Sequence, residues 1–201
     1  MLRAYPADPA RRAVALVAVA LAALALPACG AEGPAEDVEP PSETAQPVPK
    51  LPPGWKVDRN DAGGFALGVP PGWRAKAQAT RTQLKSADRL VVITVTPDRS
   101  NELIEADLEE LAESTGARYG EQFEDFELGH TDRFEHVYDG YSVTADGRRD
   151  GVRQEIELIL LRRGEIVTFT VIVQRNERFG TAAYRPTIER IVRSLRSRPV
   201  G

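Results

Sequence analysis

The stretch Gly64-Phe65-Ala66-Leu67-Gly68-Val69-Pro70-Pro71-Gly72-Trp73 carries the clearest structural signal in the sequence. Its large apolar residues alternate with alanine and glycine, which is typical of a strand with one apolar face. Pro70, Pro71 and Gly72 then predict a tight turn before Trp73. The segment therefore predicts a strand followed at once by a reversal of the chain.

The same turn pattern occurs earlier, as Leu51-Pro52-Pro53-Gly54-Trp55. We interpret the pair as repeated turn chemistry in which a tryptophan anchors each turn, and not as a duplicated domain. Trp55 and Trp73 are also the candidate binding residues, because partly exposed tryptophans often anchor protein interfaces. Simple packing within the fold is the alternative.

Strand signals dominate residues 54–201. Leu90 to Thr96 has β-branched residues at both odd and even positions, which predicts a strand covered on both faces. Arg162-Arg163-Gly164 predicts a hairpin between strands over 155–161 and 165–173, with Gly164 at positive φ. Asp146-Gly147 and Asp150-Gly151 together predict another turn, after a strand over 138–144.

Two helices are expected, one in mid-chain and one at the C-terminus. Ser100 is a candidate N-cap, Gly116 a candidate end, and the apolar spacing between them is helical. Pro186 suits the first turn of the second helix, whose apolar stripe is Ile188, Ile191, Val192 and Leu195. Layering both helices on an antiparallel sheet predicts an α+β fold.

The first 28 residues have the composition of a signal peptide. Three arginines and one acid precede or flank an unbroken apolar run of 14 residues from Ala13 to Leu26. A transmembrane helix needs about 20 apolar residues, whereas a signal peptide needs about 7–15 behind a positive segment. A buried core helix is the alternative, and the absence of any polar face disfavours it. Arg11-Arg12 leaves ordinary secretion and twin-arginine export both open.

Leu26-Pro27-Ala28-Cys29 resembles the lipobox of bacterial lipoproteins. The resemblance implies cleavage after Ala28 and attachment of lipid, palmitate among its acyl chains, to Cys29. Two or more acyl chains give stable membrane anchoring. Residues 30–53 contain seven prolines and five acids, so we expect residues 29–53 to form a disordered tether that reaches about 70 Å. The expected location is the extracytoplasmic face of the cell membrane.

The Gly64–Trp73 stretch resembles the opening strand and turn of PsbP-like domains. The terminal segment Ile188 to Leu195, with Ser194, is similar to the closing helix of the same domains. LpqN-type lipoproteins of actinobacteria carry such a domain behind a lipobox and a proline-rich tether. The resemblance, over about residues 60–197, implies an α/β/α sandwich around an antiparallel sheet and a non-catalytic, partner-binding role. It brings no catalytic or metal-binding residues.

Composition excludes several classes of function. The chain has 201 residues, a formal net charge of −4 and one cysteine. A nucleic-acid-binding domain usually has a strongly basic face, so no nucleic acid partner is expected. One cysteine cannot form an internal disulfide or a thiolate metal site. Residues 54–201 are long enough for one domain with its own core.

Three patterns could carry chemistry, and each also has a simpler interpretation. His130, Asp132 and His136 suggest a metal site, but in one strand the two histidines lie about 20 Å apart. Gly140-Tyr141-Ser142 begins a nucleophile elbow but lacks its final glycine. Glu155 and Glu157 share one face of a strand, as glycosidase carboxylates can, but solvent-facing acids produce the same pattern. We therefore predict no catalytic residue, metal or cofactor.

Two functions remain. The first is a membrane-anchored module of the cell envelope that binds a protein partner without catalysis. The second is a carrier or sensor of a small amphiphile or envelope lipid, which would need an apolar pocket of several hundred cubic ångströms. An enzyme is not expected.

Overall fold

The computed structural model describes residues 47–176 and 181–199. The described residues lie in one compact unit. The predicted signal peptide over residues 1–28, Cys29 and most of the predicted tether lie outside the described residues.

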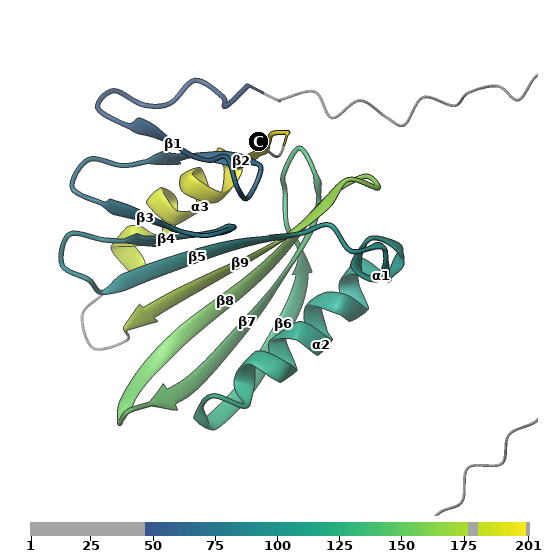
Figure 1. Ribbon diagram of the computed structural model, residues 1–201. Helices are drawn as coiled ribbons and strands as arrows, with labels where there is room; N and C mark the ends of the chain where they lie inside the picture. Colours follow the sequence, from purple (N-terminus) through teal and green to yellow (C-terminus); the bar gives the residue numbers. More distant parts are fainter. Residues whose placement is uncertain (1–46, 177–180, 200–201) are drawn as a thin grey trace, which may run out of the picture. The chain divides into compact units, whose positions relative to one another are not determined.

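A seven-stranded antiparallel sheet is the centre of the unit (Figure 1). A three-stranded antiparallel sheet lies beside it, in the order β1 (Lys56–Asn60), β2 (Phe65–Val69) and β10 (Arg196–Ser197). The strands of the large sheet, in spatial order, are β3 (Arg74–Gln78), β4 (Arg81–Lys85), β5 (Val91–Asp98), β9 (Val167–Asn176), β8 (Val152–Arg163), β7 (Asp139–Arg149) and β6 (Glu124–Arg133).

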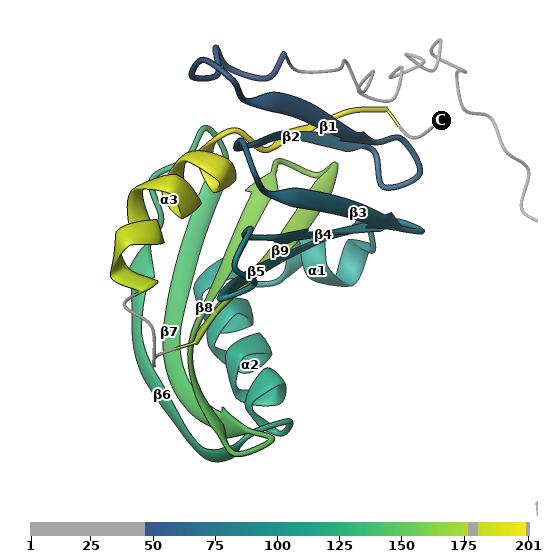
Figure 2. The same cartoon turned by 90° about the vertical axis from the view of Figure 1, so that its left-hand side faces the viewer.

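The helices cover opposite faces of the large sheet (Figures 1 and 2). The short α1 (Asn101–Glu105) leads into α2 (Leu108–Gly120), which packs on β6, β7 and β8. On the other face lies α3 (Arg185–Arg193), which follows the 3-10 turn η2 (Thr181–Tyr184) and packs against β2. The predicted α+β fold, an antiparallel sheet between helices, is confirmed.

Two apolar clusters fill these layers. The larger lies between the sheet and the layer of α3 and β2, and it contains Phe65, Phe169 and the α3 stripe. The smaller lies under α2 around Leu108 and Ala112. Strand β8 belongs to both, because Leu158 and Leu160 point to α2 while Ile159 and Leu161 point to the larger cluster.

Strand β5 differs from expectation. Val91, Ile93 and Val95 are buried, but Val92 and Thr94 are only half-buried and Thr96 is exposed. The prediction that both faces are covered is wrong for this strand, because α2 packs on the other half of the sheet. The β-branched residues on its open face satisfy strand propensity without burial.

The mid-chain helix is longer than predicted and is divided in two. Ser100 precedes α1 but its side chain makes no capping hydrogen bond. The Asp107 carboxylate accepts from the Glu110 N–H at 2.9 Å and starts α2. Gly116 lies inside α2. A Cβ at this position would come within 3.1 Å of Leu128 Cδ1. This glycine permits close helix–sheet approach and does not end the helix.

The hairpins are confirmed in part. Arg163 pairs with Val167 across the turn at Gly164, whose φ is +46°. Asp150 and Gly151 form the turn between β7 and β8. Asp146 and Gly147 are not a turn, because β7 continues through them to Arg149. A Cβ on Gly147 would lie 2.9 Å from Phe123 Cβ, so close packing explains this glycine.

Candidate functional site

Both Pro-Pro-Gly-Trp sequences form the predicted turns. The Trp55 N–H donates to the Pro52 carbonyl and the Trp73 N–H to the Pro70 carbonyl, each at 3.2 Å. The third residues, Gly54 and Gly72, have φ of +81° and +78°. Positive φ at this position defines a type II turn and favours glycine.

The two turns lie beside each other, because the β1–β2 hairpin brings its own ends together. Lys56 pairs with Val69, so both turns flank the same end of the hairpin. A Cβ on Gly54 would be 3.2 Å from the Pro71 ring. The predicted binding residues are thereby placed on neighbouring turns, which linear spacing alone did not indicate.

Trp55 and Trp73 are both half-buried and pack against the larger apolar cluster. Trp73 makes an edge-on contact with Tyr184, with ring centroids 5.8 Å apart. Trp55 lies close to Gly68, where a Cβ would be 3.1 Å from its Cε3 atom. Packing therefore accounts for one side of each ring, and their role in binding stays a prediction.

Ser194 joins the two motifs that carried the PsbP-like resemblance. It follows α3, is 1% exposed, and its Oγ accepts from the Gly68 N–H at 2.7 Å. The same hydroxyl donates to the Ile191 carbonyl at 2.6 Å. The serine of the closing helix thus holds the strand of the opening motif, a contact between residues 126 positions apart.

An open cavity of about 560 Å³ lies beside this contact. It is bounded by residues 49–53 on one side and by Arg190, Arg193 and Ser194 on the other. Leu51 and Pro52 are already half-buried here. The chain therefore contacts the domain a few residues before Gly54.

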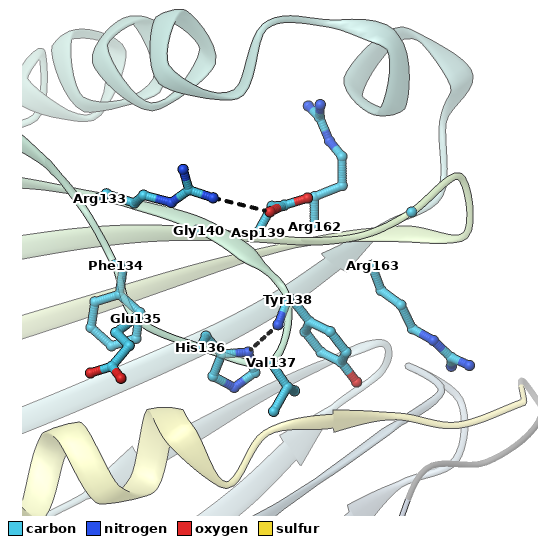
Figure 3. A pocket seen from close by; sticks show the side chains of 11 residues that line it. Arg133, Phe134, Glu135, His136, Val137, Tyr138, Asp139, Gly140, Arg162 and Arg163 are labelled. Carbon is cyan, nitrogen blue, oxygen red and sulfur yellow. Dashed lines mark hydrogen bonds and ion pairs between the residues drawn. The ribbon is translucent and has the colours of Figure 1, made fainter.

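A second open cavity, of about 490 Å³, lies between the β6–β7 loop and the β8–β9 hairpin (Figure 3). Arg133 and Asp139 form an exposed ion pair at 3.5 Å on its rim. Arg162 extends toward the helices and donates to the carbonyls of Leu103 and Ala106 at 2.7 and 2.8 Å. Arg162 thus binds the junction of α1 and α2 to the sheet.

Tyr138 and His136 form the inner wall of this second cavity. The Tyr138 ring stacks on Phe169, with centroids 6.2 Å apart, and its hydroxyl accepts from the Ser197 N–H at 2.9 Å. The His136 Nδ1 accepts from the Tyr138 N–H at 3.1 Å. Burial, and then the nearby Arg196 charge, lower the pKa of His136 to about 4. The sequence offered no signal for this arrangement, because the loop has no periodicity.

The paired carboxylates of β8 are engaged by an arginine. Glu155 and Glu157 lie on one face of the strand, as predicted, but they are not simply solvent-facing. Arg175, whose side chain is 3% exposed, contacts Glu155 at 2.5 Å and Glu157 at 3.7 Å. Burial raises the pKa of Glu157, while the Arg175 charge acts in the opposite direction.

The histidines and Ser142 lie in separate places. His130 is exposed on β6, which ends at Arg133, so His136 belongs to the next loop and not to the same strand. Ser142 lies within β7, paired with Asp132 and Ile159, and not at a strand-to-helix turn. Within residues 47–176 and 181–199, no group of three or more His, Cys, Asp or Glu is placed to hold a metal ion.

Cys29, the predicted lipidation site, lies outside the described residues. In the part of the chain that the structure describes, no helix combines the length and apolarity needed to cross a membrane.

No family model matches the sequence, and no curated protein matches it. Solved structures do. The Ran-binding protein Mog1p of Saccharomyces cerevisiae is 13% identical, with a TM-score of 0.51 over 70% of this chain and 94% of that one. Cyanobacterial PsbP (CyanoP) of Synechocystis is 11% identical, with a TM-score of 0.50 over 72% of this chain and 92% of its own.

A weaker likeness is to LpqN of Mycobacterium tuberculosis, a protein involved in cell envelope biogenesis. It is 9% identical, with a TM-score of 0.48 over 66% of this chain and 83% of its own. The likenesses to Mog1p and CyanoP show the fold. The chain has the α+β fold of Mog1 and PsbP-like proteins, and the opening and closing motifs predicted the PsbP-like part of this likeness.

Proposed function

We propose that this chain is a lipoprotein of the cell envelope, anchored to the extracytoplasmic face of the cell membrane through lipid on Cys29. The observation that carries the anchor is the position of the chain's single cysteine, three residues after the end of a 14-residue apolar run. The modification supplies more than one acyl chain, which gives stable attachment.

The domain held by this anchor binds a protein partner and does not catalyse a reaction. Its fold is that of Mog1p, which is described as Ran-binding, and of CyanoP. The groups that could have formed catalytic sites have structural partners instead. Arg175 engages both glutamates of β8, and Ser142 lies in a paired strand.

The carrier of a small amphiphile is the second candidate, and the space beneath α3 disfavours it. The cavity described between α3 and the sheet measures about 70 Å³ and is lined in part by Glu157, Arg175 and Arg185. That volume suits a few water molecules, whereas ligand pockets usually measure about 300–1,000 Å³.

Detergent phase partition of the expressed full chain tests the anchor. Wild type should enter the detergent phase, and Cys29→Ala should move to the aqueous phase. Pro27→Ala leaves Leu26, Ala28 and Cys29 in place, so it is the matched control and should stay in the detergent phase. Wild type in the aqueous phase would contradict the anchor.

Crosslinking in intact cells, together with native mass spectrometry of the purified chain, tests the binding role. A reproducible protein adduct and no retained small molecule are expected. A lipid that stays bound noncovalently through purification, with no protein adduct, would favour the carrier.

A further inference from the structure

The hairpin of β3 and β4 concentrates positive charge at one edge of the large sheet. Residues 74–90 contain five cationic side chains and one acid, Asp88. All five cationic side chains are exposed, and we call them the basic β3–β4 surface: Arg74, Lys76, Arg81, Lys85 and Arg89.

Strand register places the four charges of β3 and β4 on one face. Arg74 lies directly opposite Lys85, and Lys76 and Arg81 lie opposite Gln83 and Gln78. Leu84 and Thr82, on the other face of β4, are buried. Like charges directly across a strand pair destabilise a sheet, so this placement is not explained by the stability of the hairpin.

The charges of this surface have no acidic partner within the described residues. None of the five forms an ion pair there, and Arg81 donates only to Gln78 Oε1, at 3.0 Å. The one local acid, Asp88, accepts instead from Ser86 and Tyr184, both at 2.6 Å. The surface bounds an open cavity of about 600 Å³ whose lining contains four cations and no acidic side chain.

Strand β3 also has one edge with no strand partner among the described residues, and at one end of this edge the β1–β2 turn contacts the β3–β4 turn, where Asn60 Nδ2 donates to the Arg81 carbonyl at 3.0 Å. It is the first strand of the sheet and pairs only with β4 among the described strands. A free edge can accept an extended peptide through main-chain hydrogen bonds. Cationic side chains along the edge oppose pairing with a second copy of the same strand, because like charges repel. They favour pairing with an acidic segment.

We propose that the basic β3–β4 surface binds an extended, acid-rich segment of a partner protein, which lies along the free edge of β3. This rests on the proposed partner-binding function and names the chemistry of the partner. A membrane surface fits less well, because the large apolar side chains that are exposed, Val57, Leu128 and Val137, all lie outside β3 and β4. The surface therefore has no large apolar group to insert into lipid.

The mature chain from residue 29, with Cys29→Ser to prevent lipidation, provides the test. Its binding to poly-L-glutamate is measured by titration at low and at high salt. The wild-type chain should bind poly-L-glutamate, and high salt should weaken this binding. Lys76→Glu with Lys85→Glu should weaken it about tenfold or more. Lys56→Glu with Arg59→Glu makes the same charge change on another edge strand, β1, and should have little effect.

Other outcomes overturn the proposal. These are equal loss in both double variants, no binding at low salt, or binding to phosphatidylglycerol vesicles without binding to poly-L-glutamate.

Residues 32–43 of this chain are themselves acidic. If a chain that begins at Pro41 binds poly-L-glutamate and the mature chain does not, the occupant is the chain's own linker. Detergent partition and crosslinking of the lipidated chain are independent of this titration, so failure here leaves the proposed function standing.

Discussion

The two faces of the seven-stranded sheet differ in how they are covered. The α3 face is closed by a continuous apolar cluster in which Phe65 meets Phe169 edge-on at 5.9 Å. The α2 face has a smaller cluster over β7 and β8, and its β3–β4 part is open and cationic. Because buried apolar area is the main source of stability, the α3 face holds the fold together while the other face has surface free for binding.

Phe169→Ala gives the largest effect expected. The ring is 0% exposed and contacts both Phe65 and Tyr138. Its removal should lower the free energy of unfolding by about 3–5 kcal/mol, measured by urea denaturation. A loss under about 1 kcal/mol would show that the α3 face does not dominate stability.

Leu108→Ala probes the smaller cluster beneath α2. Leu108 is 7% exposed, at the start of the helix. The expected loss is about 2 kcal/mol, at the low end of the range for buried leucine because the site is near the surface. Hydrogen exchange should accelerate in α2 while α3 and β2 stay protected. Equal acceleration on both faces would contradict a division between them.

Ser194→Ala removes the hydroxyl that joins α3 to β2 and leaves the buried Gly68 N–H without its acceptor. The cost should be about 1–2 kcal/mol in the free energy of unfolding. Ser114→Ala is the control, because that exposed hydroxyl donates only to the Leu111 carbonyl of its own helix. Similar effects in the two variants would show that the hydrogen bond between Ser194 and Gly68 adds no more stability than an exposed hydroxyl does.

The lowered pKa of His136 predicts how the free energy of unfolding varies with pH. The pKa of His136 is lowered to about 4 from 6.5, so the folded state favours the neutral ring. This contribution is complete above pH 6.5 and is lost as the pH falls from 6.5 through 4. Its size is on the order of 1 kcal/mol, allowing for partial exposure.

The charged groups around this histidine are Arg196, Arg193 and Glu135. Urea unfolding of wild type and His136→Gln at several pH values gives the comparison. The variant should show a flatter dependence between pH 6.5 and 4. Identical slopes would falsify the assignment to His136.

Lys85→Gln should produce the smallest change and the opposite sign. It removes the like-charge pair with Arg74, so stability should rise by about 0.3 kcal/mol at low salt and by less at high salt. Lys56→Gln, opposite Val69, should give no such gain. A loss of stability in Lys85→Gln would mean that the lysine contributes to packing.

Local patterns in the sequence were sufficient for many elements. The Gly64–Trp73 alternation predicted β2 and its turn, and the stripe from Ile188 to Leu195 predicted α3. Such patterns succeed because strand and helix periods, and proline–glycine turns, depend on neighbouring residues. The predictions of a helix end at Gly116 and of a turn at Gly147 were wrong. Each glycine is there because a side chain from another part of the chain packs closely against it.

The candidate site divides in the same way. Both tryptophan turns were predicted, but their contact depends on how β1 pairs with β2. The contacts of Glu155 and Glu157 with Arg175 depend on the register between β8 and β9. This register pairs Glu155 with Arg175, 20 positions later in the sequence. The wall formed by His136 and Tyr138 lies in a loop without periodicity, so it is defined by tertiary contacts of Tyr138 with Phe169 and Ser197.

The sequence by itself determined the strand and helix periods, the two turns and the prediction of a lipid anchor at Cys29. Each of these depends on residues close together in the chain. Only the tertiary structure decided that Ser194 holds Gly68, that Arg175 contacts two glutamates, and that four cations of β3 and β4 share one open face. The reason is that register and layer packing bring distant residues together, and periodicity does not contain that information.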